Sequence, residues 1–177
     1  MKEDKTTKAS HIKKNIKIRS QIIVVSDSLS SLSVKERKIK DKSSKIAAQQ
    51  LIEKGWEVIG INYCPDEKRE IRRLVKESIE TDIELIITIG GTGISPRDVT
   101  IEAVEPILDK TLPGYGELFR NLTYHEVGTV SIMTRAIAGV VKRTVVVCLP
   151  GSPNAVRLGV SLILKEILHI QNLLRAD

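Results

Sequence analysis

The sequence predicts an α/β domain with a mostly parallel central sheet, and three observations carry that prediction. First, short runs of consecutive apolar residues recur without polar alternation, as in strands that are buried on both faces of a parallel sheet. Second, segments with apolar residues three or four positions apart separate these runs, which is the helical period. Third, 177 residues suit one domain rather than two full cores. Strands that alternate with helices in this way are typical of α/β folds.

Four segments have the pattern of buried strands. Aromatic residues make up only 3% of the chain, so the core that these strands enter must be aliphatic. Each run ends at a polar or glycine-containing turn. The expected strands are residues 21–25, 56–63, 85–89 and 145–149.

Five segments have the pattern of helices. Their apolar side chains recur at three- and four-residue intervals, which places them on one face of each helix. Gly55 follows the first of these segments and provides a helix stop. The expected helices are residues 43–54, 67–80, 99–108, 116–124 and 154–174.

Two stretches of the chain fit neither pattern, and one helix is unusually apolar. Residues 29–42 are rich in serine and lysine, and we expect a loop there. Residues 127–143 show no clear period. The expected helix at 154–174 is apolar around much of its circumference, so this helix and residues 112–124 are the expected contacts with other copies of the chain.

The net charge of +6 is concentrated at the amino terminus. Residues 1–19 carry five of these six charges, and the rest of the chain is nearly neutral. We expect residues 1–19 to form a basic, disordered leader and residues 20–177 to form a single domain. A nucleic-acid-binding function would depend on this leader alone. Because the few aromatic residues offer no stacking platform for single strands, nucleic acid is not expected as a partner.

Hydropathy and cysteine usage predict the cellular compartment. No apolar stretch has the length of a signal-peptide core or of a membrane-spanning helix. Cys64 and Cys148 lie far apart and lack the spacing of a metal site, so we expect both to be reduced. These features predict a cytoplasmic protein without a membrane partner.

Polar and glycine-rich segments follow each expected strand. In a parallel sheet, ligands bind beyond the carboxyl ends of the strands, so these segments are expected to converge on one site. The segments are residues 26–28, 64–66, 90–98 and 150–154.

The most informative of these segments is Gly90-Gly91-Thr92-Gly93. Glycine allows backbone N–H groups to approach an anion closely, and the helix that follows favours a phosphate at its amino end. The segment has neither the Gly-Lys-Ser/Thr of a P-loop nor the spacing of a dinucleotide-binding motif. From the residues alone, a phosphate-binding loop and a tight turn without a ligand both fit.

Asp66 and Asp98 each precede an expected helix. Each would therefore either cap that helix or face the site at the sheet edge. Two carboxylates at neighbouring strand ends suit Mg²⁺, which takes one or two carboxylates together with phosphate oxygens of a substrate. Arg97, beside Asp98, is a candidate for pairing with a phosphate. This combination is typical of phosphoryl or nucleotidyl transfer, and the sequence contains no zinc-site or α/β-hydrolase motif.

An eleven-residue stretch, Gly90-Gly91-Thr92-Gly93-Ile94-Ser95-Pro96-Arg97-Asp98-Val99-Thr100, resembles the signature of the MoaB/Mog family of molybdenum cofactor biosynthesis proteins. The resemblance extends over about residues 20–170 and leans toward the MoaB branch. Shorter matches follow the family's order at residues 26–28, 65–66, 113–120, 134–139 and 149–156.

The resemblance implies a three-layer αβα sandwich that assembles into trimers or hexamers. It implies that ATP and Mg²⁺ are used to adenylylate molybdopterin, with release of pyrophosphate, and that the product passes to a MoeA-type metal-insertion protein. Asp66 and Asp98 match the family's functional aspartates, and would act as catalytic residues and metal ligands. The residues that match or adjoin its substrate-binding segments are Ser26, Asp27, Gly90, Gly91, Thr92, Gly93, Ser95, Arg97, Thr134, Gly151, Ser152, Pro153 and Asn154.

Members of the family differ in whether they catalyse this reaction. The chain has Ser44 where a glycine is usual, Thr134 where serine is common, and Cys148 where some members carry asparagine. The expected function is therefore molybdopterin adenylyltransferase activity, and the alternative is a non-catalytic molybdopterin carrier or scaffold of the same pathway. The release of pyrophosphate separates the two.

Overall fold

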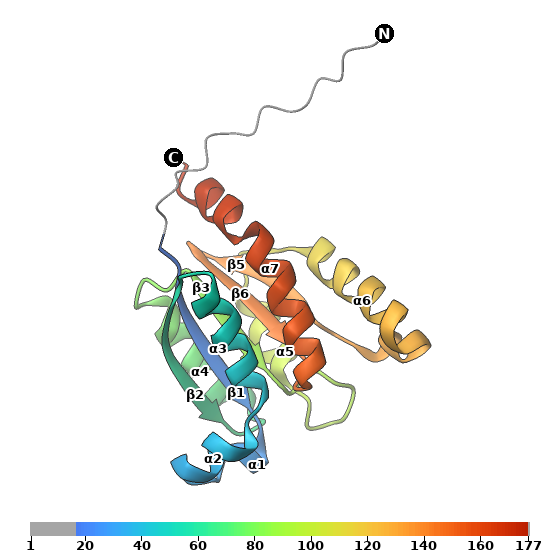
Figure 1. Cartoon of the computed structure of the whole chain (residues 1–177). Coiled ribbons are helices and arrows are strands. Elements are labelled where there is room, and N and C mark those ends of the chain that lie inside the picture. The colour runs from blue at the N-terminus through green and yellow to red at the C-terminus, as the bar shows by residue number, and fades with distance from the viewer. Residues whose placement is uncertain (1–16, 177) are drawn as a thin grey trace.

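The computed structural model describes residues 17–176 of the chain (Figure 1). The expected leader lies mostly outside the described residues, because its first 16 positions are not among them. The ordered domain begins earlier than the apolar pattern indicated. Ile18 is fully buried, and the first strand starts at Arg19.

The centre of the molecule is a six-stranded sheet in the order β2-β1-β3-β6-β5-β4. Strands β2, β1, β3 and β6 are parallel, whereas β5 and β4 run antiparallel to their neighbours. Only Lys142 and Arg143 separate β5 from β6, so the chain has no length for the crossover that a parallel pair needs. The strands are β1 (Arg19–Val25), β2 (Glu57–Cys64), β3 (Leu85–Ile89), β4 (Lys110–Thr111), β5 (Ile137–Val141) and β6 (Thr144–Leu149).

Helices cover both faces of the sheet, which gives the expected three-layer sandwich (Figure 1). One core cluster joins the sheet to α3, α6 and α7, and a second joins its other face to α4 and α5. The α-helices are α1 (Asp27–Ser30), α2 (Val34–Lys40), α3 (Ser43–Glu53), α4 (Lys68–Ile79), α5 (Thr100–Val104), α6 (Pro113–Val127) and α7 (Pro153–Leu174), and the 3₁₀ helices are η1 (Glu105–Ile107) and η2 (Gly128–Met133).

The prediction of a loop at residues 29–42 is wrong, because this segment contains the end of α1 and all of α2. A capping box starts α2: the Ser33 side chain accepts from the Glu36 backbone, and the Glu36 carboxylate accepts from the Ser33 backbone N–H. The helix expected at 99–108 is also shorter, since α5 gives way at Glu105 to a 3₁₀ turn that contains Pro106.

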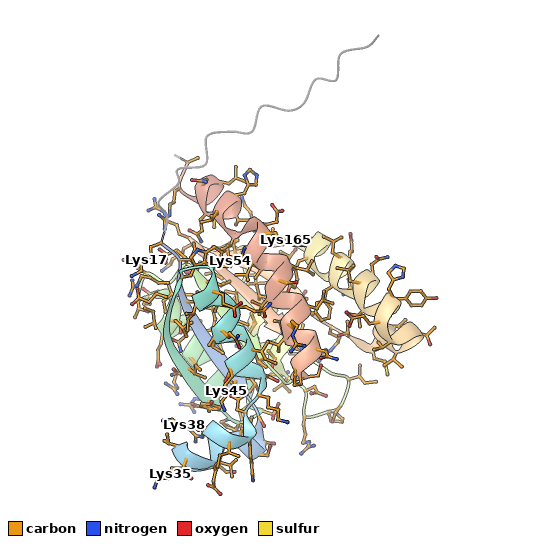
Figure 2. All side chains as sticks on the ribbon, in the orientation of Figure 1. Lys17, Lys35, Lys38, Lys45, Lys54 and Lys165 are labelled. Atoms are coloured by element: carbon orange, nitrogen blue, oxygen red, sulfur yellow. The ribbon has the colours of Figure 1, made fainter. Side chains whose placement is uncertain are left out.

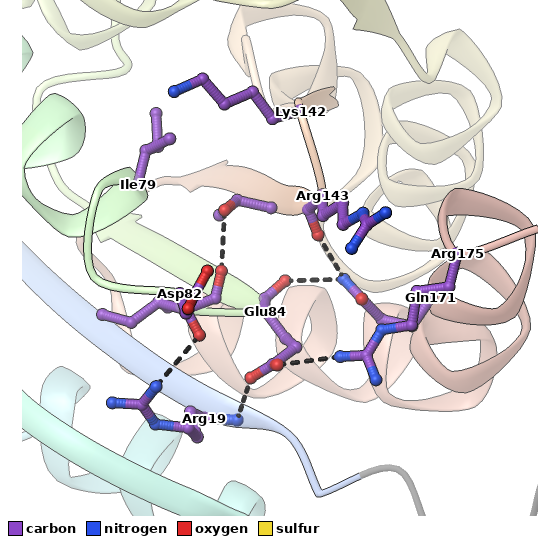
Figure 3. Close-up of a pocket in the computed structure, with 10 residues that line it drawn as sticks. Arg19, Ile79, Asp82, Glu84, Lys142, Arg143, Gln171 and Arg175 are labelled. Atoms are coloured by element: carbon purple, nitrogen blue, oxygen red, sulfur yellow. Dashed lines mark hydrogen bonds and ion pairs between the residues drawn. The ribbon is translucent and has the colours of Figure 1, made fainter. Parts of the chain in front are cut away.

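The amino ends of the strands enclose a cavity of about 620 Å³ whose polar groups bind one another (Figure 3). The Arg175 guanidinium lies 2.9 Å from the Glu84 carboxylate, and Arg19 donates to the carbonyl of Asp82 at 3.2 Å. The buried Gln171 amide donates to the backbone carbonyls of Glu84 and Arg143. We call this the amino-edge cavity, and its contacts join β3, β6 and α7.

None of the helices within residues 17–176 combines the length and the apolar character needed to cross a membrane.

Candidate active site

Backbone and side-chain hydrogen bonds gather the expected site segments at the carboxyl edge of the sheet. The Ser26 N–H donates to the carbonyl of Cys64 at 2.9 Å, so the ends of β1 and β2 are joined. The Gly90 N–H donates to the carbonyl of Leu149 at 2.9 Å, which joins the ends of β3 and β6. The four segments therefore meet at one edge, as the parallel strand pattern predicts.

Three aspartates line one cavity of about 290 Å³ at this edge. Asp27 and Asp66 hold each other, because the backbone N–H of each donates to the carboxylate of the other at 3.0 Å. The Asp98 carboxylate accepts the Ser95 N–H at 2.9 Å. We call this space the carboxylate cavity, and its lining residues are Ser26, Asp27, Ser28, Asp66, Ser95, Arg97 and Asp98.

Neither Asp66 nor Asp98 caps a helix, so that alternative is wrong for both. The residue that caps α4 is Glu67 and the one that caps α5 is Val99, and neither cap makes a side-chain hydrogen bond. Asp66 and Asp98 each engage Oδ2 with a backbone N–H, while their Oδ1 atoms accept no hydrogen bond within residues 17–176. Each carboxylate therefore keeps one oxygen available for a ligand.

Burial and like charges in the carboxylate cavity disfavour the ionised form of Asp66. Burial raises the pKa of Asp66 above its ordinary value, and the like charges of Asp27 and Asp98 raise this pKa further. The hydrogen bond from the Asp27 backbone and the charge of Arg97 lower it, without cancelling the rise. A perturbed carboxyl among like charges in a cleft is typical of a functional site, and a cation would relieve the repulsion.

The glycine-rich loop fits closely around both carboxylates. A Cβ atom on Gly91, whose φ is +63°, would lie 2.9 Å from Oδ1 of Asp66 and 2.4 Å from the Thr100 hydroxyl. A Cβ atom on Gly93 would lie 2.7 Å from Oδ2 of Asp98. Only glycine therefore lets the backbone pass this near to the carboxylates.

The Gly90 amide is not available for an anion, which corrects the expectation that all four amides of the loop would be. Its N–H donates to the carbonyl of Leu149. The N–H groups of Gly91, Thr92 and Gly93 make no hydrogen bond within the described part of the chain. Unpaired amides in a turn can bind an anion, and these three belong to the loop that packs against Asp66 and Asp98 without lining the carboxylate cavity.

A second cavity, of about 310 Å³, adjoins the first through Ser26 and carries the opposite charge. Lys40, Lys42 and Ser43 line it together with Gly90, Gly151 and Pro153, and we call it the lysine cavity. Figure 2 shows Lys35 and Lys38 on α2, and Lys45 on α3, at this same end of the molecule. The sequence interpretation did not assign these lysines to the site, because it treated their segment as a loop.

Asp41 fixes the segment that carries the lysines. Its buried carboxylate accepts from the Ser44 backbone at 3.0 Å, the Ser44 hydroxyl at 2.5 Å and the Tyr63 hydroxyl at 2.8 Å. Burial, together with the hydrogen bond to Asp41, raises the pKa of Tyr63. Ser44, which departs from the usual glycine, therefore supplies two of the three contacts of Asp41. The Asp41-Lys42-Ser43-Ser44 stretch was the only sequence feature that pointed here.

Three expected site residues lie apart from the aspartates. Thr134, Ser152 and Asn154 line a cavity of about 270 Å³ between η2 and the start of α7. This cavity shares no lining residue with the carboxylate or lysine cavity. The single pocket that the sequence predicted is thus divided into three, with Asp66 and Asp98 together in one of them.

Both cysteines are buried free thiols. Burial raises the pKa of Cys64 and that of Cys148 to about 12, so each stays protonated at neutral pH. Neither cysteine is therefore suited to act as a thiolate nucleophile.

The chain is similar to known proteins over most of its length. Residues 21–169 match the family model described as "Probable molybdopterin binding domain". A Methanocaldococcus jannaschii protein named "Probable molybdopterin adenylyltransferase" is 39% identical over 163 residues, which cover 92% of this chain and 96% of that protein. "Molybdenum cofactor biosynthesis protein B" of Bacillus subtilis is also 39% identical over 163 residues, covering 90% and 92% of the two chains.

Solved structures agree with these matches. The crystal structure of the tungsten cofactor synthesizing protein MoaB from Pyrococcus furiosus superposes with a TM-score of 0.81 at 36% identity. It covers 90% of this chain and 98% of its own. The matched range contains every residue of the carboxylate and lysine cavities. The chain is therefore a member of the molybdopterin-binding domain family of molybdenum cofactor biosynthesis proteins, in its MoaB branch.

Proposed function

We propose that this protein is a Mg²⁺-dependent molybdopterin adenylyltransferase that uses ATP. One observation carries the proposal: Asp66 and Asp98 share a cavity, and each keeps a carboxylate oxygen free beside a loop of unpaired backbone amides. The name of the Methanocaldococcus jannaschii relative supports the same activity.

The donor atoms of the carboxylate cavity suit a magnesium ion. Mg²⁺ prefers oxygen ligands and is commonly held by one or two carboxylates together with substrate phosphates. The Oδ1 atoms of Asp66 and Asp98 would hold it. Burial is the main cause of the raised pKa of Asp66, and the like charges of Asp27 and Asp98 add a repulsion that a cation would relieve. A bound Mg²⁺ supplies neutralisation of the charge on the phosphates of ATP.

The surrounding residues suit the phosphates of two anionic substrates. The amides of Gly91, Thr92 and Gly93 would donate to phosphate oxygens next to the aspartates. Lys40 and Lys42 in the adjoining lysine cavity would attract the charged groups of whichever substrate lies there. Because Ser26 belongs to both cavities, the two substrates would meet beside it.

The proposed step is a substitution at phosphorus. A terminal phosphate oxygen of molybdopterin attacks the α-phosphorus of ATP and forms a new phosphoanhydride bond. The bond between the α- and β-phosphates breaks, and pyrophosphate leaves with its electron pair. Catalysis comes from positioning and charge neutralisation, so this chain needs no nucleophilic side chain for the step.

The test is an assay of AMP transfer from labelled ATP to molybdopterin together with pyrophosphate release. We expect Mg²⁺-dependent turnover by the wild-type protein and a loss of at least about 100-fold in Asp66→Asn and Asp98→Asn. Tight molybdopterin binding without pyrophosphate release would instead identify a carrier. Full turnover in both variants would refute the assigned roles of the two aspartates.

We also propose that the protein forms a homotrimer or hexamer through α6 and η2. Seven large apolar side chains on these two elements are exposed rather than buried in the core of the chain. They are Leu118, Leu122, Tyr124, Val127, Val130, Ile132 and Met133. By contrast, α7 packs against α3 and α6 of its own chain, and Leu173 is its one strongly exposed large apolar residue within the described range.

Light scattering tests the assembly. The wild-type protein should have the mass of a trimer or hexamer, and Ile132→Glu, at a position that is 80% exposed, should reduce it to a monomer because a charge cannot be buried there unpaired. A monomeric wild-type protein at micromolar concentration would exclude the proposal. Transfer of the adenylylated product to a MoeA-type protein stays a prediction from the family.

A further inference from the structure

Arg135 lies between η2 and β5, and its guanidinium reaches both the glycine-rich loop and α5. Its Nε donates to the carbonyl of Thr92 at 3.2 Å, and its Nη2 donates to the carbonyl of Asp98 at 3.2 Å. Its Nη1 lies 2.5 Å from the Glu102 carboxylate. One side chain therefore contacts three separate points: Asp98, which lines the carboxylate cavity, Thr92, which begins the loop that leads to it, and Glu102 on α5.

The two carbonyls that Arg135 binds mark the ends of the loop at residues 92–98. Between them, Ile94 is 69% exposed, and Ser95 and Arg97 are exposed as well. The middle of the loop thus has little packing of its own to hold it. Two hydrogen bonds within the loop join Asp98 to Ser95 and form a turn that includes the Asp98 carboxylate. The position of this turn relative to the rest of the cavity depends on how the ends of the loop are fixed.

An arginine is suited to this task because its donors form a rigid planar fork. When Nε and Nη2 are both bonded, the distance between the Thr92 and Asp98 carbonyls is set by the guanidinium itself. Glu102 orients the fork from α5, and Arg135 keeps the pKa of Glu102 below its usual value, so this partner stays charged at neutral pH.

We propose that Arg135 is a positioning residue of the carboxylate cavity, which clamps both ends of the 92–98 loop and acts through Asp98. The inference rests on the proposed function, since it assigns a role to Asp98 as a cation ligand. Groups that orient metal ligands commonly change metal affinity or activity by about 10–100-fold when they are removed.

The chain offers a matched control in Arg72 of α4. Its guanidinium also donates to backbone carbonyls of α5, at 3.2 Å to Ala103 and 3.4 Å to Glu102. Like Arg135 it is half-buried, but its side chain makes no hydrogen bond to residues 92–98 in the described part of the chain. Arg72→Gln therefore removes two bonds from a guanidinium to backbone carbonyls, as Arg135→Gln does, without releasing the loop; the ion pair of Arg135 with Glu102 is tested separately by Glu102→Gln.

The experiment compares Arg135→Gln, Arg135→Lys and Arg72→Gln with the wild-type protein. Hydrogen exchange of residues 92–98 measures the loop directly. Titration with Mn²⁺, an oxygen-seeking stand-in for Mg²⁺ that is detected by its paramagnetism, measures cation binding without turnover. AMP transfer then gives kcat and the KM for ATP, and urea unfolding reports the stability of each variant.

In both Arg135 variants we expect faster exchange across the loop, Mn²⁺ binding weakened about tenfold, and a larger change in kcat than in KM. Lys should not restore the wild-type values, because one ammonium group cannot replace the fork. Arg72→Gln should leave loop exchange and Mn²⁺ affinity unchanged. If Arg135→Gln is too unstable to measure, Arg135→Lys and Glu102→Gln are compared with Arg72→Gln instead. Glu102→Gln should weaken Mn²⁺ binding less than the Arg135 variants do, because the Arg135 bonds to the Thr92 and Asp98 carbonyls remain.

Three outcomes would overturn the inference in different ways. Equal loop exchange and Mn²⁺ affinity in Arg135→Gln and Arg72→Gln would refute the clamp. Wild-type behaviour of Arg135→Lys would show that charge rather than the fork is required. A wild-type protein that binds no Mn²⁺ and transfers no AMP would refute the proposed function instead, while loop exchange would still report whether Arg135 holds the loop.

Discussion

Both edges of the sheet carry charged side chains, but the two edges use them in opposite ways. At the amino edge, Glu84 is paired with Arg175 and also accepts the Arg19 backbone N–H, so its charge is satisfied within the chain. At the carboxyl edge, Asp66 faces Asp27 and Asp98, which are like charges, and keeps an oxygen free. At the amino edge the Glu84 charge is paired, although Oε1 of the buried Gln171 has no partner among the described residues, whereas at the carboxyl edge like charges face one another and a cation would relieve their repulsion.

This contrast matters because cavity volume alone would favour the amino edge over the proposed site. The amino-edge cavity, at about 620 Å³, has twice the volume of the carboxylate cavity, at about 290 Å³. Its bonded groups hold strands and helices together, which is a structural role. The smaller cavity retains unpaired donors and acceptors, and these are what a site needs in order to bind and orient a substrate.

The largest effect that separates the two edges is expected from a pair of glycine substitutions. Gly91 at the carboxyl edge and Gly55 at the amino edge both have positive φ, +63° and +75°. The positive φ alone should make Ala at either position lower the free energy of unfolding by roughly 1–2 kcal/mol, and Gly91→Ala should lose more because its Cβ also meets the Thr100 hydroxyl and the Asp66 carboxylate. Gly91→Ala should also lower turnover by about 100-fold, because its Cβ displaces the Asp66 carboxylate.

Gly55→Ala is the control, since a Cβ atom there has no neighbour within 4 Å. Its turnover in the AMP-transfer assay should match that of the wild-type protein. Equal turnover in the two variants would show that the close fit of Gly91 against Asp66 has no functional meaning.

The next effect concerns stability at the amino edge. Gln171→Leu removes the two hydrogen bonds to the Glu84 and Arg143 carbonyls inside a buried site. We expect the free energy of unfolding to fall by about 1–3 kcal/mol, because a buried carbonyl loses its partner. Turnover of the folded protein should not change. A loss of turnover without a loss of stability would assign a function to this edge.

The smallest effect is a dependence of stability on pH, measured without metal. Because the pKa of Asp66 is raised in the folded state, the folded protein binds this proton more tightly than the unfolded chain does. The contribution of Asp66 to the free energy of unfolding therefore falls as pH rises from the ordinary aspartate pKa through the raised value, and then stays low. Asp66→Asn lacks this loss and should be the more stable protein at neutral pH.

Thermal unfolding across this pH range, with and without Mg²⁺, checks the prediction. The stability advantage of Asp66→Asn should shrink toward acidic pH, and Mg²⁺ should stabilise the wild-type protein more than the variant. A wild-type protein that gains stability relative to the variant as pH rises would contradict the raised pKa.

Much of this molecule follows from patterns in the sequence. The strand at residues 85–89 has the predicted bounds, because five consecutive aliphatic or threonine residues suit a strand that is buried on both faces, as strands inside a parallel sheet are. The helix α2 was missed although its capping box, Ser33 to Glu36, is visible in the sequence. Its apolar residues Val34 and Ile39 are exposed, so no buried stripe marks the helix.

The sequence by itself determined the layered α/β fold and the placement of Asp66 and Asp98 together at the carboxyl edge of the sheet, because residue period and strand ends are local properties. Only the tertiary structure decided that these aspartates do not cap helices, that the expected pocket is three cavities, and that Arg135 reaches the loop from 37 positions away. Those outcomes depend on which distant groups find one another as hydrogen-bond partners, and no spacing along the chain encodes such a choice.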